Sequence, residues 1–292
     1  MSLVRPILVA SAVAFAGCAG HAATSSAPTP SRAPAAQAPA APAAPAPLRY
    51  GAGTGHYRLE SQSHVEQDAM GQTTAFDLVT GVVLSTATAP DTAGNLGVAI
   101  TIDSLSITSP TMPMAVPPAA DLAAARGRVV RLVVSTQGQT IGLTPPDSAG
   151  VALRQVAQGL REFLPMLPPG APTPGTSWSD TSSMATPSQG GTVTVHLTRQ
   201  HRVVGWEDHE GTRALHLATT VAYTVTGTSE AQGQSVELSG GGQRNGDAFV
   251  TAAGVYLGGT MSDSSLVNAS IASAGLVVPV RTRSHSSFTR LP

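Results

Sequence analysis

The sequence predicts a mainly β protein: a large curved antiparallel sheet or half-barrel, with one amphipathic helix at about residues 148–164 packed on its concave face. Two observations support this fold class. From Tyr50 onward, short runs of alternating apolar and polar residues are separated by Gly, Pro, Ser and Asp, which is typical of strands with one buried face. The apolar stripe of a single helix also needs a surface to cover it, and a concave sheet is the simplest one.

Turn residues pair several of the expected strands. The runs 193–198 and 215–225 lie on either side of Asp208-His209-Glu210-Gly211, which is typical of a hairpin turn with glycine in a left-handed conformation. Thr136-Gln137-Gly138 predicts a second hairpin between the runs 129–134 and 139–143.

Other strands are predicted from alternation alone. Residues 98–102 and 105–107 are expected to form a strand pair that is interrupted near Asp103. Gly240-Gly241-Gly242 is expected to let the sheet bend or bulge. The last strands are expected near residues 236–238, 248–250, 255–257, 276–280 and 285–291.

The helix has recognisable start and stop signals. Asp147 or Ser148 can serve as its N-cap, and Pro165 ends it. Its apolar stripe consists of Leu153, Val156, Leu160, Phe163 and Leu164. A second, weaker helical turn is expected at Ala119–Arg126, ended by Gly127.

The N-terminus predicts export. Arg5 is followed by the apolar run Ile7 to Ala16, which is too short to span a hydrocarbon core of ~30 Å. The small pair Ala16-Gly17 then precedes Cys18, the only cysteine of the chain. This arrangement resembles the lipobox of bacterial lipoproteins, with Phe15 where Leu is usual. The other interpretation is an ordinary secretory signal with an incidental cysteine.

The lipoprotein resemblance implies cleavage before Cys18 and acylation of this residue, so the membrane would be a partner of the protein. Because Ala19 rather than an acidic residue follows, the resemblance favours the periplasmic side of the outer membrane in a host with two membranes. The expected organisation is a signal peptide at 1–17, a lipid anchor and disordered Ala/Pro-rich tether at 18–48, and one β-rich domain at 49–292. Seven prolines between Pro28 and Pro47 support the tether, because such a segment has little apolar surface on which to collapse.

Composition narrows the possible functions. The net charge of −1 and the charged fraction of 11% give no basis for nucleic-acid binding. All 16 basic residues are arginine, so no lysine Schiff base or P-loop is possible. An acylated Cys18 leaves no thiol for catalysis or for a zinc site. We therefore expect no catalytic residue, no cofactor and no metal, and an enzyme is the least favoured class.

The remaining polar clusters are interpreted as structural. His196 and His216 are expected on paired strands and could be neighbours, yet no His-Glu-x-x-His motif occurs. Solvated strand histidines are therefore favoured over metal ligands for His196, His201, His209 and His216. The acidic group Glu207, Asp208 and Glu210 is assigned to a solvated turn. Trp178 is expected at a strand start and Trp206 at the edge of the sheet.

The order of strands, helix, Pro-rich turn and Trp178 is similar to that of secreted LolA-like half-barrel domains. The segment from Phe163-Leu164-Pro165 to Pro174-Gly175-Thr176-Ser177-Trp178 carries most of the likeness. This resemblance implies a cavity for a lipid or another hydrophobic ligand. The alternative is a structural or protein-interaction lipoprotein with a filled core, whose partner the sequence leaves unknown. A cavity of several hundred Å³ under the helix would distinguish the two.

Overall fold

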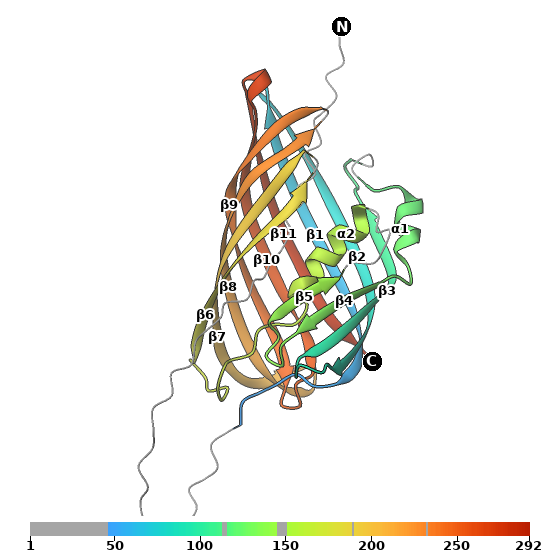
Figure 1. The fold of residues 1–292 in the computed structure, drawn as a ribbon, viewed down its shortest axis with the longest axis vertical. Coiled ribbons are helices and arrows are strands. Elements are labelled where there is room, and N and C mark those ends of the chain that lie inside the picture. Colours follow the sequence, from blue (N-terminus) through green and yellow to red (C-terminus); the bar gives the residue numbers. More distant parts are fainter. Residues whose placement is uncertain (1–45, 113–115, 145–150, 189, 232) are drawn as a thin grey trace, which may run out of the picture.

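The computed structural model describes residues 46–112, 116–144, 151–188, 190–231 and 233–292. The described residues form one open antiparallel sheet of eleven strands, in the order β5-β4-β3-β2-β1-β11-β10-β9-β8-β7-β6. The long strands form a tall, strongly coiled wall, and α2 lies against its inner side (Figure 1). The expected fold class, a large curved antiparallel sheet with little helix, is confirmed.

The strands of the first half are β1 (Gly53–Ala69), β2 (Gln72–Pro90), β3 (Leu96–Thr108), β4 (Val129–Val134) and β5 (Thr140–Thr144). Those of the second half are β6 (Ser177–Ser188), β7 (Gly191–His209), β8 (Thr212–Ala231), β9 (Gln234–Thr251), β10 (Tyr256–Ile271) and β11 (Leu276–Leu291). The helical elements are α1 (Ala119–Ala125), α2 (Val151–Gly159) and the 3-10 turns η2 (Leu160–Glu162) and η3 (Ala272–Ala274).

Several strands are longer than the sequence predicts. The predicted pair at 98–102 and 105–107 is wrong: both runs belong to β3, which pairs with β2 along its length. Ile102 pairs with Leu84 and Ser104 with Val83, so Asp103 is the extra residue of a bulge. The bulge breaks the alternation without ending the strand, which is why the sequence pattern suggests two strands. Strands β9 and β11 also each join two runs predicted as separate strands, here with a regular register between the runs.

The hairpin predicted at residues 208–211 is confirmed in a tighter form. His209 and Thr212 are still paired, so the loop is the two residues Glu210 and Gly211. Both have positive φ, 50° and 77°, as a type I′ turn requires. This turn sets the register of β7 and β8, which carry part of the site described below.

The predicted helix at 148–164 ends at Gly159 in the structure rather than at residue 164. Its expected N-cap residues, Asp147 and Ser148, lie outside the described residues. Helix α2 covers Val151–Gly159, and the chain then tightens into η2. The second predicted helical turn is confirmed as α1, which ends one residue earlier than expected.

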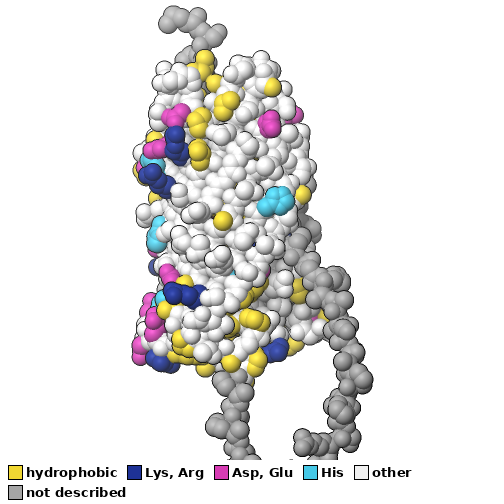
Figure 2. All heavy atoms as spheres, turned by 90° about the vertical axis from the view of Figure 1, so that its left-hand side faces the viewer, with side chains coloured by type: hydrophobic (Ala, Val, Ile, Leu, Met, Phe, Trp, Pro, Cys, Tyr) yellow, Lys and Arg dark blue, Asp and Glu magenta, His cyan; other side chains and the backbone are white. Residues whose placement is uncertain are grey.

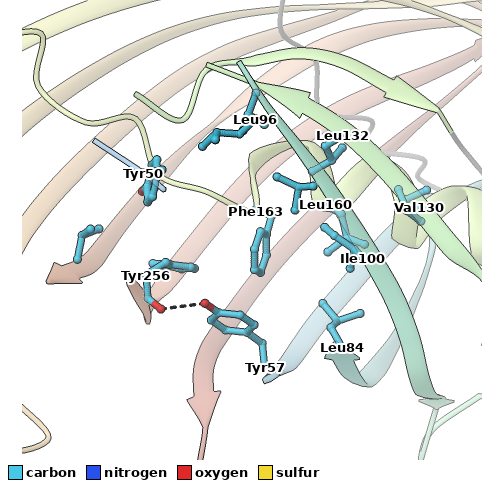
Figure 3. Packing of buried hydrophobic residues seen from close by; sticks show 14 of the residues in the cluster. Tyr50, Tyr57, Leu84, Leu96, Ile100, Val130, Leu132, Leu160, Phe163 and Tyr256 are labelled. Carbon is cyan, nitrogen blue, oxygen red and sulfur yellow. Dashed lines mark hydrogen bonds between the residues drawn. The ribbon is translucent and has the colours of Figure 1, made fainter. Parts of the chain in front are cut away.

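The apolar stripe of this helical segment completes the main core, on the concave side of the sheet. Leu153, Leu160 and Phe163 are buried. Val156 and Leu164 are partly buried and pack against the same cluster. Phe163 lies among aromatic rings, edge-on to those of Tyr57 and Tyr256 at centroid distances of 5.0 and 5.7 Å (Figure 3). The core directly under this stripe is therefore filled.

Two smaller apolar clusters continue the interior further along the strands. One joins β6, β7 and β8 through Met184, Val195, Leu197, Val221, Tyr223 and Val225. The other joins β1, β2, β9, β10 and β11 through Val65, Phe76, Val236, Ala269, Ile271, Val278 and Val280. Within the described ranges, no helix combines the length and apolar character needed to cross a membrane.

The outer surface has a different character. On the side that carries β6 to β9 in Figure 1, Figure 2 shows mainly backbone and uncharged polar side chains, with few charged or hydrophobic ones. Most buried apolar side chains of β6, β7 and β8 belong to the inner clusters described above.

We predict that Leu160→Ala lowers the free energy of unfolding by about 2–5 kcal/mol, because Leu160 is 1% exposed within the main core. Chemical denaturation measures this change. The matched control is Leu266→Ala on β10, where the side chain is 43% exposed and the expected loss is below about 0.5 kcal/mol. A loss at position 160 as small as that at position 266 would show that the helix does not complete the core.

Candidate functional site

A polar layer separates the apolar clusters on the concave face. Along β7, the inward positions are apolar at Val195 and Leu197, polar at Arg199 and His201, and apolar again at Val203. All five follow the two-residue period of one strand face. The polar layer therefore lies on the concave side of the sheet, between buried apolar clusters that limit the access of water to its charges.

The register of the sheet aligns the charges of this layer in one row. Asp180 on β6 pairs with Arg199 on β7, and Arg244 on β9 pairs with Asp263 on β10. Val221 on β8 stands between the two arginines, paired with both. Charges of opposite sign thus occupy adjacent strands on either side of β8.

Glu162, in η2, lies above this row and joins its two halves. Its Oε1 accepts a hydrogen bond from Arg199 Nε at 3.1 Å, and its Oε2 accepts one from Arg244 Nη1 at 3.0 Å. Arg199 Nη1 donates to Asp180 Oδ1 at 2.8 Å, and Arg244 Nε donates to Asp263 Oδ2 at 3.2 Å. One carboxylate from the helical segment thus bridges two arginines of the sheet.

The Arg244 end of the row is the most deeply buried. The residue is 1% exposed, and its guanidinium lies 5.6 Å from the centre of the Tyr223 ring. Tyr223 donates a hydrogen bond to Asp263, and burial together with this carboxylate raises the pKa of the tyrosine to about 12. Gly242 leaves room for the tyrosine, whose hydroxyl oxygen would lie 2.6 Å from a Cβ at that position.

At the other end of the row, a histidine extends the network. His201 Nε2 lies 2.9 Å from Asp180 Oδ2, and Nδ1 lies 3.0 Å from Thr219 Oγ1. The imidazole is 5% exposed and stacks on Trp178 at a centroid distance of 5.1 Å. Burial disfavours the charged form of Asp180, but the hydrogen bond from His201 and the charge of Arg199 outweigh it and lower the pKa of the carboxyl group.

A pocket of about 160 Å³ opens over this end of the row. Its polar floor includes Asp180, Arg199, His201 and Thr219. The apolar part of its lining includes Leu164, Pro165, Met166, Tyr256, Met261 and Phe288. Thr140 of β5 and Thr181 of β6 also line it, so the pocket lies between the two edge strands of the open sheet.

The segment after η2 covers the pocket and is fixed by several contacts. Tyr50 donates a hydrogen bond to the carbonyl of Pro165 at 2.8 Å, and the Leu167 amide donates to the carbonyl of Gln137 at 2.8 Å. Gly138, at φ 89°, passes so close that a Cβ would lie 2.4 Å from the Pro165 carbonyl oxygen. Together with the Glu162 bridge, these contacts hold the segment against both halves of the sheet.

The pocket is smaller than the several hundred Å³ that would have marked a lipid cavity under the helix. It lies beside the helical stripe, because Leu160 and Phe163 fill the space beneath it. The arrangement combines an apolar wall with a fixed set of hydrogen-bonding groups. Such a surface suits recognition of a small amphipathic molecule.

The structure separates the histidines that the sequence places together. His196 pairs with Thr224 and His216 with Gly205, so the two are not neighbours. His216 instead contacts Asp247 and Glu207 on the surface and, like His209, stacks on Phe249. Of these four histidines, His201 belongs to the buried network, so the prediction that it is solvated is wrong: it lies on the inward face of β7 and is 5% exposed. Within the described ranges, no group of His, Cys, Asp and Glu has an arrangement that could hold a metal ion.

Other predicted positions are resolved as follows. Cys18 and most of the predicted tether lie outside the described residues. Trp178 is the second residue of β6, as predicted, whereas Trp206 lies on β7, which is not an edge strand, and packs against the main core. The register through Gly240–Gly242 is regular, so no bulge occurs there. At these three glycines, backbone atoms of the neighbouring strands lie so close that a Cβ would collide with them.

The comparisons with known proteins establish no family. No family model and no curated protein matches the chain. Two crystal structures of OccK2 (OpdF) from Pseudomonas aeruginosa, one of them in complex with glucuronate, are similar to 82% and 84% of this chain, over 98% and 100% of their own. The sequence identities are 5% and 7% and the TM-scores 0.23 and 0.21. Values this low do not establish a shared fold.

Proposed function

We propose that this protein is a non-catalytic binding module of the cell envelope that holds a small, partly apolar ligand in the pocket beside residues 161–166. The pocket itself carries the proposal, because apolar side chains and convergent polar groups line one concave space. Pockets of this composition are the usual sites for small molecules.

The volume limits the ligand. An engineered apolar cavity of about 150 Å³ is large enough for benzene. A pocket of about 160 Å³ therefore suits one ring, a short chain or the end of a longer chain. A complete lipid would have to extend beyond the pocket.

The filled core supports a second candidate function. The three apolar clusters pack the interior on both sides of the polar layer, as in a scaffold that presents its surface to a protein partner. In that case the pocket would hold only water. Ligand binding distinguishes the two functions directly.

The membrane anchor is a separate part of the proposal. It rests on the sequence before and at Cys18. Acylation would tether the domain to the envelope, with the periplasmic face of the outer membrane as the expected location in a host with two membranes.

We predict that the mature protein begins at an acylated Cys18 and fractionates with membranes, whereas Cys18→Ser is neither acylated nor membrane-bound. Intact mass and cell fractionation measure both properties. Ser26→Ala in the predicted tether is the control and should retain the anchor. A wild-type chain that is soluble and carries no acyl group would contradict this part of the proposal.

We predict that toluene, as a probe of suitable size, binds the wild-type pocket. Methionines make this measurable, because Met166 and Met261 line the pocket while Met70 and Met184 lie elsewhere. In spectra of protein labelled at the methionine methyl groups, toluene should shift the first two resonances and leave the other two in place.

A pocket-filling variant provides the control for this experiment. Ala248 also lines the pocket, so Ala248→Leu should abolish these shifts, whereas Ala75→Leu at an exposed position of β2 should leave them unchanged. If toluene leaves the Met166 and Met261 resonances of the wild type unshifted, the ligand-binding function is wrong and the scaffold function is favoured.

A further inference from the structure

The inference concerns the chemistry of the ligand, and it rests on the proposed function. The Asp180 end of the polar row forms the floor of the pocket, through the chain Asp180–His201–Thr219. All three side chains line the pocket. The hydrogen-bonding capacity that this chain leaves unused determines which polar group a ligand can bring.

For a neutral imidazole at His201, the geometry assigns the protons of this hydrogen-bonded series. The Asp180 carboxylate can only accept hydrogen bonds, so His201 Nε2 at 2.9 Å must donate. In a neutral imidazole, Nδ1 is then the acceptor, and Thr219 must donate its hydroxyl proton to it at 3.0 Å. The Thr219 hydroxyl has thereby used its only proton. Its oxygen retains lone pairs that can accept a hydrogen bond.

Arg199, the cation beside the Asp180–His201–Thr219 series, already has hydrogen-bond partners. Arg199 donates to Glu162, Asp180 and Ser182 and therefore serves the network itself. Arg161, the other arginine of the lining, also has an interaction of its own. A ligand carboxylate would in addition approach the charges of Asp180 and Glu162. The pocket thus offers the lone pairs of Thr219 as an acceptor, and it disfavours an anion because three carboxylates, from Asp180, Glu162 and Asp247, line it against two arginines.

We propose that the ligand of this pocket is an apolar molecule that ends in a hydroxyl group, and that this hydroxyl donates a hydrogen bond to Thr219 Oγ1. The apolar body lies against Leu164, Met261 and Phe288, which line the same space. Thr219 is the specificity-determining residue. His201 and Asp180 act as positioning residues, because they fix the direction in which the Thr219 proton points.

The test compares toluene, benzyl alcohol and benzoate, which share one ring and differ at one substituent. Thr219→Val removes the acceptor at almost constant volume, and it should weaken the binding of benzyl alcohol roughly three- to tenfold while leaving toluene binding unchanged. Thr219→Ser keeps the hydroxyl and should retain the affinity for benzyl alcohol. The control is Thr220→Val, whose exposed side chain donates a hydrogen bond to Asn245 at 3.1 Å, outside the pocket lining.

Wild-type spectra provide a second measurement, which remains informative if Thr219→Val does not fold. Benzyl alcohol, and not toluene, should shift the ¹⁵N resonance of His201 Nδ1, because the new hydrogen bond polarises the Thr219 hydroxyl. The inference is overturned if bound benzyl alcohol leaves that resonance unchanged, if Thr219→Val weakens both ligands equally, or if benzoate binds more tightly than benzyl alcohol. Toluene binding with any of these results would leave the proposed function in place, whereas a failure of toluene to bind would remove the proposed function first.

Discussion

The carboxylate of Glu162 connects the helical segment to the open sheet. It accepts hydrogen bonds from Arg199 on β7 and from Arg244 on β9, two strands that do not pair with each other. A sheet with two free edges has no hydrogen bonds to fix its curvature across the gap. The helical segment spans this gap: Glu162 binds it to β7 and β9, and the contacts of Pro165 and Leu167 bind it to Tyr50 and to the β4–β5 turn.

Burying this bridge costs free energy, and the many ion pairs around it offset that cost. Removing charged groups from water costs several kcal/mol for each ion unless other charges and hydrogen bonds compensate. Three carboxylates, from Asp180, Glu162 and Asp263, alternate with the two guanidinium groups here, so each arginine contacts two acids. Apolar residues of similar volume could stabilise the fold as well. The polar layer is therefore better explained by the pocket that it forms than by stability alone.

The sequence predicts the architecture well and the site poorly. Alternation and turn residues identify the sheet, the two hairpins and the buried stripe of the helical segment, because each depends on residues close together in the chain. The alternation was sufficient in principle to find Arg199 and His201, since both continue the inward face of Val195 and Leu197. Their partners were not accessible in this way. Asp180, Glu162, Arg244 and Asp263 come from four separate elements: the register of the sheet aligns Asp180, Arg244 and Asp263 with Arg199, and the packing of the helical segment adds Glu162.

Hydrogen exchange of residues 160–167 in Glu162→Gln, compared with the wild type, tests the central claim most directly. Breaking a buried ion pair costs about 3 kcal/mol or more, so the amide of Leu167, bonded to the Gln137 carbonyl, should exchange roughly a hundredfold faster. The amides of β3 should remain protected, and Glu60→Gln at an exposed position of β1 should behave like the wild type. Unchanged protection of Leu167 in Glu162→Gln would contradict the claim that this carboxylate holds the segment to the sheet.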